Sequence, residues 1–367
     1  MEKKKLDSVQ ALRALAYICV FIQHTGISVL GRVGNFGVTV FFILSGFLMI
    51  LSYFDSDRIT GCSVIYNFRF AAGKLKKLYL LHIVMTFVAI PIRAAECEGA
   101  YFNLGFIRDL VLNVFLLQSW YPDVNVAFSL NGVAWYLSTC ALQYFMFPLI
   151  YKRTKTYKNL MQPVLISLLL FAAQALLAFV SCYFPWNGMY EGDSFVAWFT
   201  YIFPVSRLVD FIIGCNLGYV FLRSRKNLES RKNTLYSLME IILGCMLLAA
   251  FVLFNAGFVK KMEWARVTIW VIPACISVVL FTLKKGFFTR MFTNRFFVYL
   301  GNISAVTFLV HQLAIKVVQL LTKDIGGKNY SKNPMVLTAV FLLVIVISQL
   351  WISANKIIRL RCAHHGN

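Results

Sequence analysis

Two ionisable residues interrupt the first apolar segment of the chain, and their spacing suggests chemistry. Arg13 and His24 lie eleven residues apart. In an α-helix, eleven residues make about three turns, so both side chains share one face at a separation of ~16 Å along the axis. Histidine is the commonest general base in enzymes because its ordinary pKa lies near neutral pH. The spacing therefore predicts a base deep in the helix and a cation nearer its start.

Each of these residues also has a structural interpretation. Arg13 could be an anchor whose long side chain brings its charge to the membrane surface, and His24 could be a core histidine hydrogen-bonded to a neighbour. Ionisable side chains are costly inside a membrane, which makes each one a functional candidate by default. The sequence leaves both interpretations open.

Later segments add two more ionisable features. Lys74 and Lys77 are three residues apart and project from one helix face. Two cations held in this way suit a phosphate-bearing ligand, although they could also be anchors at the inner membrane surface. His311 falls ~21 Å into its segment, at about the depth of His24, and this match suggests a cavity that both histidines share.

Six other side chains could line a substrate cavity. They are Ser45, Trp135, Arg207, Asn302, Ser304 and Gln312. A rough count of depth places the two serines and the two amides near His24, where they could donate hydrogen bonds to a developing oxyanion. Arg207 could instead pair with Asp210, three residues later. No CxxC pair or Cys/His cluster suggests a metal site, and only Cys97 and Cys182 could pair as a disulfide in the outer compartment.

The composition identifies the elements that must position these residues. Hydrophobic residues make up 59% of the 367 residues and charged residues only 14%, with a mean hydropathy of +0.71. A soluble protein needs roughly 25% charged residues, so lipid must solvate much of this chain. Its length allows about ten membrane spans of ~20 residues. The net charge of +21 is then typical of basic cytoplasmic loops rather than of nucleic-acid binding, for which no soluble domain is evident.

We predict an all-α polytopic membrane protein with about ten transmembrane helices. Their predicted ranges are 10–31, 36–54, 77–94, 131–150, 161–183, 196–222, 235–256, 267–284, 297–321 and 334–356. Both termini are then cytoplasmic, and the basic loops lie inside, as the positive-inside rule requires. A span at 104–120 would place the basic loop 152–158 outside, so we predict that 104–120 is re-entrant or interfacial.

Small residues are frequent in the second predicted span. Gly34, Gly37, Ser45 and Gly46 would let another helix or a ligand approach the backbone closely. No internal repeat or soluble appendage is visible, and we predict that residues 1–367 form one membrane domain.

Six motifs, in order along almost the whole chain, resemble those of the acyltransferase 3 family, whose members are mostly bacterial membrane proteins. The start Leu6–Ala16 resembles the family's LDxLRGLA, and Arg13 and His24 stand at its R-x10-H spacing. The other matches are Phe41–Phe47 to FFxLSGF, Trp135–Pro148 to WxLxxExxFYLxxP, Arg207–Gly214 to RxxxFxxG, and Leu300–Ser304 with His311 to LGxxSYxxYLxH. Any one of these is weak, but six in order are a specific signal.

The resemblance implies transfer of an acyl group, usually acetyl from acetyl-CoA, to a hydroxyl of a cell-envelope glycan or lipid-linked sugar at the bacterial inner membrane. Acyl-CoA, the acceptor and the bilayer are the implied partners, with no bound cofactor. His24 would be the catalytic histidine, Arg13 would line the donor path, and Lys74 and Lys77 would occupy the family's RxxR positions. The departures from the family are these two lysines in place of arginines, Cys140 in place of a glutamate, and Ala305-Val306 in place of Ser-Tyr.

Two mechanisms fit this expectation. An acyl-CoA entering from the cytoplasm would leave its phosphates near Arg13 and the lysine pair and bring its thioester near His24. The histidine would act either as a general base toward the acceptor hydroxyl or as a carrier that forms an acyl-histidine. The main rival is a transporter or flippase for a glycan precursor, which would favour two halves with matching broken helices, and the sequence shows none. A scaffold protein would leave the aligned polar positions unexplained.

Overall fold

The fold is built from helices throughout the part of the chain that the computed structural model describes, which comprises residues 7–27, 32–56, 58–96, 102–183, 192–255, 265–323, 330 and 332–364. The longer helices are α1 (Asp7–His24), α2 (Val33–Tyr53), α3 (Val64–Glu96), α6 (Trp135–Lys155), α7 (Met161–Tyr183), α9 (Pro204–Ser230), α10 (Asn233–Asn255), α12 (Val271–Leu283), α14 (Arg295–Thr322) and α15 (Pro334–His364). The shorter elements are α4 (Leu104–Val114), η3 (Gln118–Trp120), α5 (Val124–Ala127), η4 (Gly132–Ala134), α8 (Gly192–Ala197), η5 (Trp198–Ile202), α11 (Ala265–Thr268) and α13 (Phe287–Phe292).

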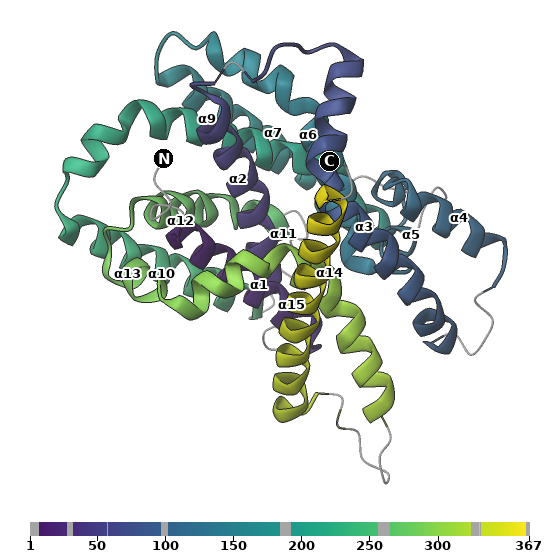
Figure 1. Ribbon diagram of the computed structural model, residues 1–367. Helices are drawn as coiled ribbons and strands as arrows, with labels where there is room; N and C mark the ends of the chain where they lie inside the picture. Colours follow the sequence, from purple (N-terminus) through teal and green to yellow (C-terminus); the bar gives the residue numbers. More distant parts are fainter. Residues whose placement is uncertain are drawn as a thin grey trace.

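Nine helices within these described ranges are long and apolar enough to cross a membrane, which confirms an all-α polytopic membrane protein. They correspond to nine of the ten predicted spans. The tenth, α1, begins at Asp7 and ends at His24, and its polar residues make it less apolar than the others. It lies among the other helices, packed against α2 and α14 (Figure 1).

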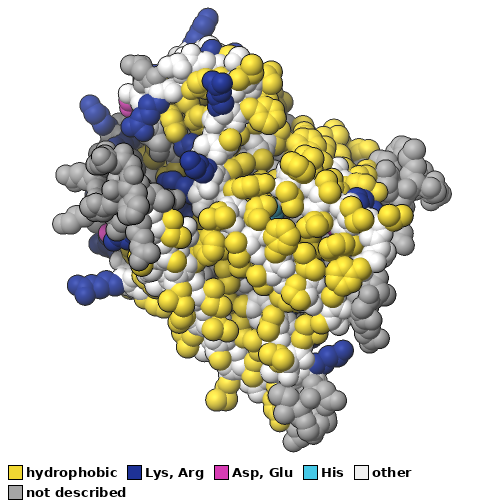
Figure 2. Space-filling view, turned by 45° about the vertical axis from the view of Figure 1, so that its right-hand side comes forward, with side chains coloured by type: hydrophobic (Ala, Val, Ile, Leu, Met, Phe, Trp, Pro, Cys, Tyr) yellow, Lys and Arg dark blue, Asp and Glu magenta, His cyan; other side chains and the backbone are white. Residues whose placement is uncertain are grey.

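The surface of the protein exposes many hydrophobic side chains, as the surface of a membrane protein does. Figure 2 shows a face covered mostly by hydrophobic side chains, with most of the visible lysines and arginines gathered toward one edge. Large apolar side chains are exposed on several helices, among them Leu169 (69%), Leu248 (63%) and Leu350 (65%). Soluble monomers rarely expose so much contiguous apolar surface, so these helices face lipid.

Several predicted boundaries were wrong. Helix α1 ends at His24, seven residues before the predicted end of the first span. Helix α3 begins at Val64, thirteen residues before the predicted start, because the lysines at 74–77 interrupt the apolar pattern without interrupting the helix. The predicted span 196–222 is not one regular helix. A π-helical turn, Trp198–Ile202, precedes α9, which begins at Pro204. Proline is well suited to the first turn of a helix, where its missing N–H is not needed.

The segment 104–120 does not form a spanning helix. Its helix α4 has eleven residues, about 17 Å at 1.5 Å per residue, against the ~30 Å of a bilayer core. The backbone after it turns through Leu116 at a φ of 58°, and the hydroxyl of Ser138 on α6 donates to the carbonyl of Leu116 at 2.5 Å. Its length agrees with the predicted re-entrant or interfacial segment.

Glycines let the central helices approach one another closely. A Cβ atom added to Gly37 would lie 2.3 Å from the carbonyl oxygen of Ala16 on α1, and one added to Gly46 would lie 2.1 Å from that of Phe211 on α9. A Cβ on Gly301 of α14 would lie 1.8 Å from a carbonyl oxygen of α1. This confirms the close packing predicted for the small residues of the second span.

We therefore expect Gly46→Val to destabilise the bundle. The added side chain must separate α2 from α9, and overpacking of this kind costs about 1–3 kcal/mol or more. Thermal unfolding of the detergent-purified protein should show a clear fall in Tm. Gly244→Ala is the control, because a Cβ there has no neighbour within 4 Å. Equal Tm values for the two variants would contradict the close contact.

Candidate active site

Two cavities lie along α1, one around each of its two ionisable residues. The first, here called the arginine chamber, has a volume of about 240 Å³ and is lined by Arg13 of α1, Ser45 of α2 and Lys74 of α3, together with Tyr136 and Tyr144 of α6. The second, the histidine chamber, has a volume of about 360 Å³ and is lined by His24. The sequence placed a cation and a base on one helix face, and the structure gives each a cavity of its own.

His24 and His311 meet directly at the histidine chamber. The Nδ1 atom of His24 lies 3.2 Å from the Nε2 atom of His311, and the ring centroids are 5.0 Å apart. The same Nδ1 lies 2.9 Å from the carbonyl oxygen of Val20. On the other ring, Nδ1 of His311 lies 2.8 Å from the carbonyl oxygen of Phe308 and 3.2 Å from that of Thr307. The match in depth predicted from sequence is therefore a contact, but the two histidines do not share the cavity, because His311 is fully buried and only His24 lines the chamber.

These four distances determine where the protons lie when both rings are neutral. A backbone carbonyl only accepts hydrogen bonds, so Nδ1 of His311 carries the proton and Nε2 of His311 is an acceptor. Nδ1 of His24 faces that acceptor and the carbonyl of Val20, so it too carries its proton. The lone pair of His24 is consequently on Nε2. An imidazole with one nitrogen fixed as a donor and the other unprotonated is the arrangement a general base needs.

Trp135 and Gln312 line the same chamber as His24. The side-chain oxygen of Gln312 accepts from the backbone N–H of Val133 at 3.0 Å, which fixes the orientation of the amide. A Cβ added to Gly132 would lie 2.8 Å from that oxygen, so only glycine leaves the amide in place. The amide nitrogen of Gln312 is then the group available to donate to a ligand.

Three cations of the histidine chamber were missed from the sequence. Arg93 of α3, Arg266 of α11 and Lys316 of α14 all line it. Glu96 accepts from Arg93 at 2.5 Å and from Lys316 at 3.1 Å. Lys316 could have been identified from the sequence, because it is a charged residue inside a predicted span, five residues after His311.

The arginine chamber contains only one of the two predicted lysines. Lys74 lines it with Arg13 and Ser45, and its Nζ atom lies 4.6 Å from the ring centroid of Tyr53. Lys77 is exposed and lines none of the described cavities. The three-residue spacing turns Lys77 about 60° away from Lys74, which is enough to take it off the buried face of α3.

Three other predicted cavity residues lie elsewhere. Arg207 is fully buried and bonds within the bundle, to Asp210 and to the hydroxyl of Thr39, each at 3.1 Å. It therefore joins α9 to α2 instead of lining a chamber. Asn302 is exposed: nine residues at 100° each put it on the face of α14 opposite His311. Ser304 is buried, and its hydroxyl donates to the carbonyl of Gly301 at 2.7 Å.

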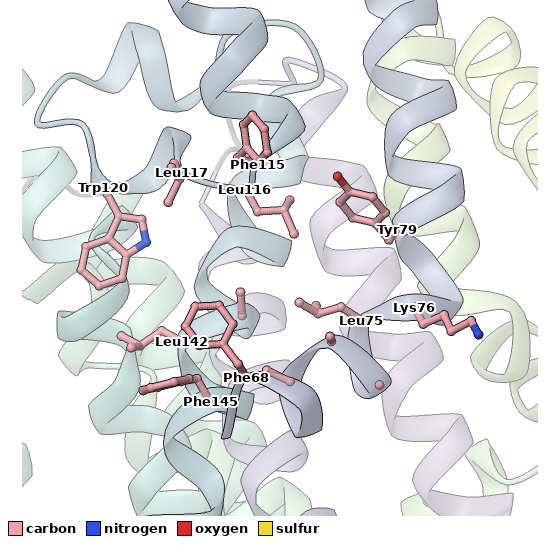
Figure 3. A pocket seen from close by; sticks show the side chains of 14 residues that line it. Phe68, Leu75, Lys76, Tyr79, Phe115, Leu116, Leu117, Trp120, Leu142 and Phe145 are labelled. Carbon is pink, nitrogen blue, oxygen red and sulfur yellow. The ribbon is translucent and has the colours of Figure 1, made fainter. Parts of the chain in front are cut away.

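The largest described cavity, about 730 Å³, is an apolar groove away from both histidines. It runs between α3, α6 and the segment after α4, and Figure 3 shows Phe68, Tyr79 and Trp120 around its open centre. Several of its side chains are exposed where the helices face lipid. Size alone does not identify the active site, because this groove lacks the histidine pair. The predicted disulfide cannot be placed, since Cys97 lies outside the described residues.

Comparison with known proteins identifies the family of the chain. Residues 6–352 match a family model described as an acyltransferase domain. The chain belongs to the acyltransferase 3 family. It is also 27% identical over 237 residues to the acyltransferase MdmB of Streptomyces mycarofaciens, a match that covers 59% of this chain and 57% of that protein. The chain thus spans little more than half the length of this relative. No solved structure matches it.

One difference from the family pattern, the cysteine at position 140, can be located in the structure. Cys140 stands where many family members have a glutamate, and here its side chain is 2% exposed. It packs in the main apolar core with Tyr136 and Tyr144 around it and lines neither chamber. Cys140 thus lies behind the arginine chamber, next to Tyr136 and Tyr144, which line it.

Proposed function

We propose that this protein is a membrane-embedded acyltransferase that moves an acyl group, with acetyl as the first choice, from acyl-CoA to a hydroxyl of a glycan or lipid-linked sugar. The observation that carries the proposal is the contact of 3.2 Å between the two histidines at the wall of a cavity. It leaves the lone pair of His24 on Nε2. A second cavity with two cations lies along the same helix, where a CoA phosphate could bind.

The transfer follows from this arrangement. Nε2 of His24 takes the proton of the acceptor hydroxyl as the hydroxyl oxygen attacks the thioester carbon. The C–S bond breaks, and the departing CoA thiolate takes the proton from His24. The amide nitrogen of Gln312 is our candidate donor to the oxyanion that develops on the carbonyl oxygen. In the alternative, Nε2 attacks the thioester carbon, and the C–S bond breaks to release the CoA thiolate. The acceptor hydroxyl then attacks the acyl carbon, its proton passes to the thiolate, and the C–N bond breaks to return His24 to its starting form.

The donor enters from the side of the arginine chamber. Its phosphates contact Arg13 and Lys74, which supply two positive charges for charge-assisted hydrogen bonds. The pantetheine arm then runs along α1 toward His24, ~16 Å away along the axis. Lysine offers no bidentate fork, so Lys74 binds a phosphate as a point charge. The bacterial inner membrane, with the arginine chamber on its cytoplasmic side, is the location that fits the positive-inside rule.

The acceptor binds in the histidine chamber. Aromatic rings of Trp135 and Tyr201 and the side-chain amides of Gln23, Asn125 and Gln312 line it. The wall therefore combines aromatic and aliphatic side chains with many polar and charged ones. This combination suits a sugar, whose ring faces are apolar and whose hydroxyls both donate and accept.

The proposal is tested by transfer of radiolabelled acetyl from acetyl-CoA in membranes that contain this protein. Envelope glycolipids are supplied as acceptors, and label is followed into glycan and into free acetate. We expect label in the glycan fraction, absent from membranes without the protein. If well-folded protein transfers no label to any acceptor offered, the result favours transport of a glycan precursor over acyl transfer.

Lys74→Ala should weaken donor binding, whereas Lys77→Ala should not. Hydrogen bonds to charged groups contribute about 1.5–3 kcal/mol, so we expect roughly a 10- to 150-fold rise in KM for acetyl-CoA with Lys74→Ala. The exposed Lys77 is the matched control on the same helix. Initial rates over a range of acetyl-CoA concentrations measure both. Equal effects of the two substitutions would mean that the arginine chamber does not bind the donor.

A further inference from the structure

Three aromatic rings from three helices separate the two chambers. Phe41 of α2 and Tyr136 of α6 line the arginine chamber, and Phe308 of α14 lines the histidine chamber. The ring centroids are 6.1 Å apart for Phe41 and Tyr136, 5.9 Å for Phe41 and Phe308, and 5.0 Å for Tyr136 and Phe308. Each ring therefore contacts the other two, and we call this set the aromatic partition.

The aromatic partition packs against Phe42 on one side and contacts His311 on the other. The ring of Phe42 stacks on Tyr136 at 4.6 Å, with 22° between the planes. The centroid of Phe308 lies 5.8 Å from that of His311. Phe308 is 5% exposed. Because these touching rings line one cavity or the other, we place them on the path of an acyl group from Arg13 to His24.

We propose that the aromatic partition sets the size of the acyl group transferred and keeps water from crossing between the chambers. This inference rests on the proposed acyltransferase function. Both chambers have polar residues in their walls, so joining them would create a wet path through the bundle. An apolar constriction excludes water by dewetting, and rings in mutual contact leave room only for a narrow thioester arm. An acyl group no wider than that arm, such as acetyl, passes, and an aromatic or branched acyl group is held back.

Water exclusion also protects the donor. Next to an unprotonated histidine, water can attack the thioester carbon in place of the acceptor hydroxyl. The C–S bond then breaks, and the proton reaches the thiolate, giving free CoA and the carboxylic acid. Excluding competing water from a reactive centre is one function of a closed site. Truncation of a partition ring is expected to raise hydrolysis relative to transfer.

The first experiment measures the barrier itself and needs no catalysis. Ser45→Cys places a thiol in the arginine chamber, and peptide mass spectrometry follows its reaction with a small, charged, membrane-impermeant thiol reagent added to either face of sealed vesicles. We expect reaction from the arginine-chamber side only. Adding Phe308→Ala should raise the rate from the opposite side at least tenfold. Equal rates from both sides before truncation, or no change after it, would overturn the proposed barrier.

The second experiment measures selectivity. Acetyl-CoA and benzoyl-CoA are compared as donors, because the benzoyl ring is wider than the pantetheine arm, and transfer and hydrolysis are recorded separately. Phe308→Ala should shift the ratio of kcat/KM values toward benzoyl-CoA about tenfold or more and raise the share of hydrolysis, while Phe308→Trp should do the opposite. Phe41→Ala, on another helix, provides a second truncation in case the first does not fold. Phe145→Ala, on the groove side of α6, is the control and should change neither ratio.

The two experiments separate two kinds of failure. If neither donor supports transfer by the parent protein, the proposed function fails, while the thiol reaction still decides whether the partition is a barrier. If transfer occurs but truncation of Phe308 and of Phe41 leaves both the donor preference and the hydrolysis share unchanged, the partition has no role in selectivity.

Discussion

His24→Ala is expected to reduce acyl transfer by roughly 10²- to 10⁴-fold, the usual contribution of a positioned general base, and to leave binding of acyl-CoA nearly unchanged. Nε2 of His24 is the nitrogen that the hydrogen bonds leave unprotonated at the cavity wall. The neighbouring His311 is fully buried and does not itself line the chamber, so we do not expect it to replace the lost base. The donor cations lie in the other chamber.

The measurement pairs initial rates of acetyl transfer with equilibrium binding of acetyl-CoA to the same purified protein. His82→Gln is the matched control. His82 is also a buried histidine, bonded to the carbonyl of Asn113 at 2.8 Å, and it lines neither chamber. Loss of both transfer and binding with His24→Ala would indicate a structural role for His24. Full activity in this variant would exclude it as base and as acyl carrier.

His311→Ala is expected to lower kcat by roughly 10- to 150-fold with little change in either KM. When His24 takes a proton, its Nδ1–H becomes part of an imidazolium, and His311 supplies one of the two acceptors that face it. A hydrogen bond to a charged group is worth about 1.5–3 kcal/mol, which gives this range of rates. The carbonyl of Val20 still holds the tautomer, so some activity should remain. His311 is thus a positioning residue.

A conservative substitution distinguishes this role from simple packing. His311→Gln retains an acceptor oxygen at about the reach of Nε2, so we expect it to recover part of the lost kcat, whereas His311→Leu should not. Both variants fill most of the space and should have similar Tm values. If leucine and glutamine restored kcat equally, the hydrogen bond to His24 would have no part in the reaction.

Much of the architecture follows from the sequence because it depends on local properties. The apolar composition requires a membrane, and apolar segments of ~20 residues predict the helices. Helical geometry places Arg13 and His24 on one face without knowledge of any other helix. The failures at this level are local too. The first thirteen residues of α3 were not predicted because basic residues interrupt the apolar pattern there. The π-helical turn before Pro204 has no sequence pattern from which it could be predicted.

The assignment of residues to the site was decided by the tertiary structure. Helical periodicity gives the angle between two side chains of one helix. The packing of the neighbouring helices determines which of these side chains faces a cavity. Packing therefore places the half-buried Lys74 beside Arg13 and leaves Lys77 outside, and it turns Asn302 away from the face that carries His311. The sequence by itself determined a membrane bundle with a base and a cation on one helix. Only the packing of α14 against α1 brought the second histidine to 3.2 Å from the first and so established which nitrogen is free to react.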